Sequence, residues 1–140
     1  MASSTSPSTT DRTRPLRVWL GVDATTCAVP GILVVAGAPL VAPVLGYPAA
    51  FLVPVGCVLI ACGVLFGLLA SGRGLTTKAV RGVIGFNALW VVASVALVVS
   101  GAFGPTTVGV VVMIAQAVGV AGIAACQAMT LRTATPSLAS

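Results

Sequence analysis

Apolar residues gather in four long runs along the chain, at about residues 16–37, 48–70, 79–101 and 107–130. A helix rises about 1.5 Å per residue, so roughly 20 apolar residues cross a hydrocarbon core of about 30 Å. Each run is therefore long enough to span a membrane. The pattern predicts an all-α fold, a four-transmembrane-helix bundle with short connections.

The segments outside these runs are mostly polar. Residues 1–15 are rich in Ser and Thr and have no apolar face, so we expect a disordered cytoplasmic tail. Residues 133–140 predict a loose cytoplasmic tail, which leaves residues 16–132 as the membrane domain. Between the first two runs, residues 38–47 carry two prolines and no charge, and they predict an apolar external loop.

The first and third runs resemble each other. RVWLGVDATTCAVPGILVVAG at 17–37 aligns with RGVIGFNALWVVASVALVVSG at 81–101, and this alignment places Asp23 on Asn87. Each half of the chain contains two spans, so both halves enter the membrane in the same direction. The sequence thus predicts two parallel helical-hairpin repeats related by a pseudo-two-fold axis along the membrane normal.

Composition and charge agree with a membrane protein. Hydrophobic residues make up 58% and charged residues 6% of the chain, whereas about 25% of residues are charged in soluble domains. The basic residues bracket the apolar runs on one side, which predicts cytoplasmic N- and C-termini and gives no reason to expect nucleic-acid binding. These topology residues are Arg12, Arg14, Arg17, Arg73, Lys78, Arg81 and Arg132.

Few side chains are suited to catalysis or metal binding. The chain has no histidine, which excludes the commonest zinc and haem sites. The four cysteines lie within apolar runs without CxxC spacing, and we interpret them as buried apolar residues: Cys27, Cys57, Cys62 and Cys126. No catalytic triad or carboxylate pair is present, so we expect no enzyme activity, no cofactor and no metal.

Polar residues share one face of each of two predicted helices. Seven residues make nearly two helical turns, so each set of three lies on one stripe. Such stripes are predicted to face the bundle interior and one another: Asp23, Pro30 and Gly37 in the first run, and Asn87, Ser94 and Gly101 in the third. Gln116 and Gln127 in the fourth run are predicted to form hydrogen bonds between helices.

The second and fourth runs carry stripes of small residues that allow helices to approach closely. Gly63 aligns with Gly122, and Gly63 with Gly67 forms a GxxxG pattern. The pattern favours packing within the bundle over self-association. The predicted helix-packing residues are Gly56, Gly63, Gly67, Gly119 and Gly122.

Asp23 is the one acid within an apolar run, where an Asp costs about 2.5–3.5 kcal/mol on insertion scales. One interpretation is a structural hydrogen bond to Asn87, with Arg17 or Arg81 bending in. The other is a carboxylate that binds a proton or cation. The first is favoured, because no second acid is present to relay a proton. Trp90 lies deep in its run and also needs a partner for its indole N–H.

The arginine-rich start, Asp23 in a glycine-containing first run, and AVRGVIGFNALWVVAS at 79–94 resemble small, uncharacterised four-helix integral membrane proteins of high-GC actinobacteria. The resemblance covers about residues 16–132, and its most specific part is the string Asn87-Ala-Leu-Trp90-x3-Ser94. It implies the fold and a plasma (inner) membrane location. It supplies no activity.

Two hypotheses for function follow from these features. The leading one is a structural or accessory protein in the lipid bilayer that packs against other membrane helices, either its own copies or a larger complex. The alternative is a small oligomeric transporter or channel using Asp23, since proteins of the small multidrug-resistance type use one carboxylate in their first span. The one-sided distribution of basic residues disfavours the dual topology of that type.

Overall fold

A computed structural model describes residues 8–138, and in it the four apolar runs form four helices. These are α1 (Thr9–Leu45), α2 (Ala49–Ala70), α3 (Thr77–Ser100) and α4 (Thr107–Leu138). Each helix is long and apolar enough to cross a membrane, and the described range contains no strand. The predicted all-α architecture with four potential membrane spans is confirmed.

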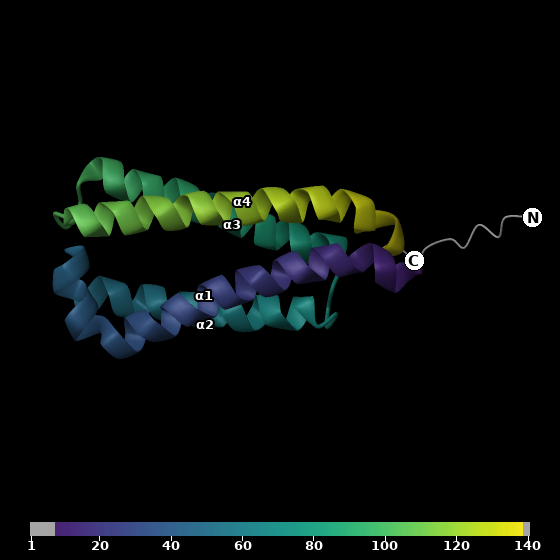
Figure 1. The fold of residues 1–140 in the computed structure, drawn as a ribbon, viewed down its shortest axis with the longest axis horizontal. Helices are drawn as coiled ribbons and strands as arrows, with labels where there is room; N and C mark the ends of the chain where they lie inside the picture. The colour runs from purple at the N-terminus through teal and green to yellow at the C-terminus, as the bar shows by residue number, and fades with distance from the viewer. Residues whose placement is uncertain (1–7, 139–140) are drawn as a thin grey trace, which may run out of the picture.

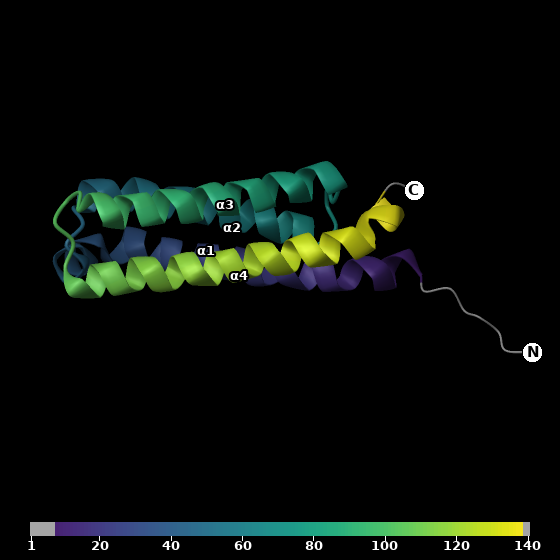
Figure 2. The same cartoon turned by 90° about the horizontal axis from the view of Figure 1, so that it is seen from above.

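The helices run lengthwise beside one another as two hairpins (Figure 1). α1 packs along both α2 and α4, and α3 packs along α4. Figure 2 shows α2 and α3 in one layer, with α1 and α4 in the other. The start of α1 and the end of α4 lie at the same end of the bundle, which we call the basic end. The opposite end, where the loops carry no charge, is the neutral end.

α1 is longer than its apolar run predicts. It includes residues 9–15 of the predicted tail and most of the predicted loop at 38–47, while residues 1–7 lie outside the described residues. Its 37 residues correspond to about 55 Å. Pro39 and Pro43 do not end the helix, because any other backbone in an apolar segment leaves more polar groups unpaired. Figure 1 shows α1 turning near its C-terminal end, where these prolines lie.

α4 also continues past its predicted end. Residues 133–138 of the predicted loose tail are helical, and residues 139–140 lie outside the described part of the chain. Ala134 is buried and Leu138 packs against the apolar core, so the extra turns of α4 add apolar contact with the rest of the bundle. By contrast, α2 and α3 match their predicted spans within two residues, because Pro48 precedes α2 and Thr76 caps α3 by accepting a hydrogen bond from Ala79 N at 3.1 Å.

The main apolar core lies toward the basic end. The rings of Phe66 on α2 and Phe86 on α3 meet edge to face, with centroids 6.4 Å apart. Arg17 Nε donates to the Ala70 carbonyl at 2.6 Å and so satisfies an unpaired backbone acceptor at the end of α2. All four helices contribute to this core, whose members include Leu16, Leu20, Phe66, Leu69, Val80, Val83 and Leu131.

A second contact joins the hairpins at the neutral end. Thr106 donates through its backbone N to Leu45 O at 3.1 Å and through its hydroxyl to Val44 O at 2.6 Å. These bonds satisfy carbonyls at the C-terminus of α1. Gly109 packs directly against the Leu45 carbonyl, where no Cβ would fit. The hairpins therefore meet at both ends of the bundle.

The predicted packing glycines divide into two groups. A Cβ at Gly56 would lie 2.7 Å from Val35 Cγ2, and one at Gly63 would lie 2.8 Å from Ala28 Cβ, so these glycines allow α1 and α2 to pack closely. A Cβ at Gly67 would make an ordinary contact with Ala24 Cβ of α1, at 3.9 Å. A Cβ at Gly119 or Gly122 would have no atom within 4 Å beyond its own helix backbone. The prediction that Gly119 and Gly122 pack within the bundle is therefore wrong, because both lie on the exposed surface of α4.

Candidate functional site

Three polar side chains from three helices meet in the interior. Asp23 on α1 accepts hydrogen bonds at Oδ2 from Asn87 Nδ2 on α3 and from Gln127 Nε2 on α4, each at 2.7 Å. Asn87 Nδ2 also approaches Gln127 Oε1 at 3.3 Å. Asp23 and Gln127 are fully buried and Asn87 is 2% exposed. We call these three residues the polar cluster.

The polar cluster contains the hydrogen bond that the aligned repeats predict between Asp23 and Asn87. The proposed arginine contacts are not present: Arg17 bonds the end of α2, and Arg81 is exposed. The sequence predicts a hydrogen bond between helices for Gln127, but it does not identify the partner. A signal for its position is depth, because Gln127 lies within two helical turns of Arg132, much as Asp23 lies within two turns of Arg17.

The surroundings of Asp23 favour a structural role for its carboxyl group. Oδ2 receives two amide N–H donors, and Oδ1 faces the thiol of Cys27 at 3.8 Å. Hydrogen bonds in a low-dielectric interior are electrostatically stronger than those in water. The two hydrogen bonds to Asp23 therefore connect the α1–α2 hairpin to both helices of the α3–α4 hairpin.

A second hydrogen-bond network connects α3 and α4 nearer the neutral end. Trp90 Nε1 donates to Gln116 Oε1 at 2.9 Å, and Gln116 Nε2 donates to Ser94 Oγ at 2.9 Å. Ser94 Oγ in turn donates to the Trp90 carbonyl at 2.8 Å. The indole N–H of Trp90 thus has the partner that its depth requires, and both partners of Gln116 lie within its own hairpin.

The two predicted stripes face each other only over part of their length. Asp23, Asn87 and Ser94 are buried, but Pro30 is exposed and Gly101 ends α3 in the left-handed conformation, with φ of 64°. Between the polar cluster and the Thr106 contact at the neutral end, a cavity separates the hairpins, so the two stripes do not meet along this part.

A cavity of about 620 Å³ occupies this separation. We call it the interhairpin cavity. Cys27 and Asn87, which both contact Asp23, lie where the cavity meets the polar cluster, and Trp90 and Gln116 line one wall. Tyr47 lines it at the neutral end. The remaining lining is almost entirely apolar, with side chains from all four helices.

Tyr47 lies in the turn between α1 and α2 and is buried within the bundle. It is only 2% exposed, and its ring lies 5.9 Å from that of Phe51 and 6.3 Å from that of Phe103, measured between centroids. Its hydroxyl has no hydrogen-bond partner among the described residues. Burial raises the pKa of the Tyr47 phenol, so it remains a neutral donor at physiological pH. The sequence gives no signal for this burial, which depends on contacts between distant segments.

The cysteines and acids form no metal site in the described range, where no group of three or more candidate ligands comes together. All four thiols are free. Cys27 is buried as predicted, but Cys57 is exposed on the surface of α2, where a small apolar side chain faces the surroundings of the bundle. The prediction that every cysteine is buried is therefore wrong.

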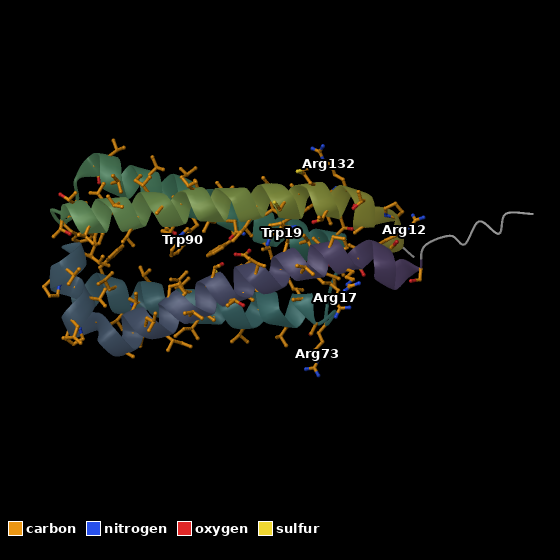
Figure 3. All side chains as sticks on the ribbon, in the orientation of Figure 1. Arg12, Arg17, Trp19, Arg73, Trp90 and Arg132 are labelled. Carbon is orange, nitrogen blue, oxygen red and sulfur yellow. The ribbon has the colours of Figure 1, made fainter. Side chains whose placement is uncertain are left out.

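Charged side chains lie away from the polar cluster. Figure 3 places Arg12, Arg17, Arg73 and Arg132 toward the basic end, and Trp90 much farther along the bundle. No Lys or Arg of the described residues lines the cavity, and Asp23 is the acidic residue of the polar cluster. Comparisons with protein-family models, with curated proteins and with solved structures give no match for this chain.

Proposed function

We propose that this protein is a structural or accessory component of the membrane that packs against other membrane helices, either its own copies or a larger complex. The observation that carries the proposal is the uncovered small-residue face of α4. Gly119 and Gly122 are exposed and have no neighbour within 4 Å of a Cβ position. Ala115 and Val118, at helical spacing from them, are exposed as well.

The comparison between the two hairpins supports this proposal. We infer that the hairpins are copies of one unit, related by a pseudo-two-fold axis, in which Gly63 corresponds to Gly122. Gly63 is covered by Ala24 and Ala28 of α1. In lipid, small residues favour association because they let helix backbones approach. A second helix lying on Gly122 would give α4 the close contact that α1 gives α2.

The polar cluster fits the same proposal, because its hydrogen bonds hold the two hairpins together. Both amide donors to Asp23 Oδ2 come from the other hairpin. Interhelical hydrogen bonds of this kind average about 0.6 kcal/mol each in a membrane and reach about 1.7 kcal/mol. A stable, self-contained bundle can then present α4 to a partner.

The proposed location is the plasma membrane, with both termini in the cytoplasm. The support is the gathering of the basic residues at the basic end (Figure 3). In a cysteine-free background, Ser100→Cys at the neutral end is expected to react with a membrane-impermeant maleimide on intact cells. Ser71→Cys at the basic end should react only after permeabilisation, and the reverse pattern would refute this orientation.

The packing proposal is tested by replacing small exposed residues with leucine. Gly122→Leu puts a bulky side chain on the proposed α4 contact, while Ala61→Leu makes a similar change on an exposed position of α2. Chemical cross-linking in native membranes is expected to capture a partner or a second copy with the wild type and Ala61→Leu, but several-fold less with Gly122→Leu. A lone monomer in every case, in membranes and in mild detergent, would contradict the proposal.

A transporter or channel that uses Asp23 is the second candidate. The observation in its favour is that Cys27 and Asn87 both contact Asp23 and line the interhairpin cavity. Proton or cation flux in reconstituted vesicles, abolished by Asp23→Asn, would support it. Absence of flux, or flux that Asp23→Asn leaves unchanged, would remove it.

A further inference from the structure

We propose that the interhairpin cavity binds one acyl chain of a membrane glycerolipid, and that the lipid ester carbonyl accepts a hydrogen bond from Tyr47. The binding site goes beyond the packing role, since it lies between the hairpins while Gly122 lies on the surface of α4. Gly119 lies at the edge of both regions, whereas Gly122 does not line the cavity, so changes at Gly122 and at Val120 distinguish a partner helix on α4 from a lipid in the cavity.

The size and lining of the cavity indicate the class of ligand. Its volume of about 620 Å³ lies within the range of small-molecule pockets, roughly 300–1,000 Å³. The walls carry apolar side chains such as Val34, Leu52, Leu59 and Ile123, and no charged residue of the described chain lines them. A hydrocarbon chain matches these walls, whereas a charged group would lose its hydration without gaining a partner.

The polar groups that line the cavity are already paired, with one exception that points to a ligand. Gln116 is bonded to Trp90 and Ser94, and Asn87 Nδ2 is bonded in the polar cluster. The Tyr47 hydroxyl, in a side chain 2% exposed, has no partner among residues 8–138. Buried polar groups in native proteins are nearly always hydrogen-bonded. An acceptor oxygen on the occupant of the cavity would satisfy this donor.

The position of Tyr47 selects the ester carbonyl as that acceptor. Tyr47 lies in the turn between α1 and α2, at the neutral end of the membrane-spanning helices. This is the level of the membrane interface, where one end of a molecule is apolar and the other is hydrated. A glycerolipid has its ester groups at this level and its acyl chain directed inward, so one molecule would fill the cavity and reach Tyr47.

The exposed part of the cavity lining comes from α1 and α4. Thr26 and Val29 on α1 and Val112 and Gly119 on α4 line the cavity and are also exposed at the surface of the bundle. Figure 1 shows the two hairpins farther apart toward the neutral end than near the basic end. A chain can therefore enter from the surrounding bilayer without passing through water.

Native mass spectrometry of the full-length protein tests the proposal with two probes, a diester phosphatidylcholine and its diether analogue of equal chain length. The wild type is expected to retain one lipid and to bind the diester roughly fivefold more tightly, the effect of one hydrogen bond. Tyr47→Phe should bind both lipids equally, at the level of the diether. Val120→Trp, which fills the cavity, should retain neither, whereas Val92→Trp on the exposed face of α3 should behave as wild type.

Several results would overturn the proposal. These are equal retention by Val120→Trp and wild type, the same ester preference in Tyr47→Phe, or no retained lipid in the wild type. Displacement of the diester by an isoprenoid quinone at a lower concentration would assign the cavity to a different ligand. If Val120→Trp does not fold, as judged by its helical circular dichroism, the comparison of wild type with Tyr47→Phe decides, because that change keeps the ring.

Discussion

Asp23 lies in an apolar interior, and it obtains its hydrogen-bond donors from two helices of the opposite hairpin. Part of this arrangement is predictable from sequence, because aligning the repeats places Asp23 and Asn87 at equal depth. The hydrogen bond of Gln127 to Asp23 is harder to predict from sequence, because only the distance of Gln127 from Arg132 indicates its depth. The burial of Tyr47 could not be predicted, because it involves contact with Phe103, which lies between α3 and α4 and is distant in sequence.

At the scale of single residues, Gln127→Leu is expected to destabilise the bundle by about 1–2 kcal/mol, because it removes one of two amide donors to the buried Asp23 carboxyl. Unfolding by denaturant in detergent micelles measures the change. The double variant Asp23→Leu with Gln127→Leu should recover part of the loss, since it also removes the acceptor. Strictly additive effects of the two single changes would show that the side chains do not interact.

At the scale of the helices, hydropathy locates the centre of each span but not always its ends. The predicted ends of α2 and α3 agree with the structure because local signals mark them, including Pro48, Thr76 and Gly101. The ends of α1 and α4 do not, because tertiary contact and the need to pair backbone groups keep residues near Pro39 and Pro136 helical. Sequence-based rules for helix ends assume solvent that can pair the free backbone groups.

Helix packing predicts that alanine substitution at Gly63 and at Gly122 changes the stability of the bundle differently. Gly63→Ala would bring its Cβ to 2.8 Å from Ala28 Cβ and 3.0 Å from Ala24 O, so a loss of about 1–2 kcal/mol is expected. Gly122→Ala meets no neighbour, and it should be neutral or stabilise the isolated chain by about 0.5–1 kcal/mol through helix propensity. Thermal unfolding of both variants in micelles is the measurement, and equal effects would contradict the packing difference.

The whole molecule consists of two hairpins that meet at both ends and separate between them. The apolar core and the polar cluster hold them together toward the basic end, and Thr106 joins them at the neutral end. The interhairpin cavity lies between these contacts. Hydropathy predicts the number of helices, but it contains no information about this separation, which depends on how side chains from different helices fit together.

The polar cluster strengthens the association of two hairpins that the apolar core and Thr106 also join, as expected when helices insert first and associate afterwards. The most direct test of this central claim is co-expression of residues 1–74 and 75–140 as separate chains, followed by co-purification from the membrane. The wild-type halves should associate, and Gln127→Leu should reduce their association several-fold. Gln116→Leu should leave it unchanged, because the partners of Gln116 lie in its own hairpin. Equal association of the Gln127→Leu and Gln116→Leu halves would contradict the claim.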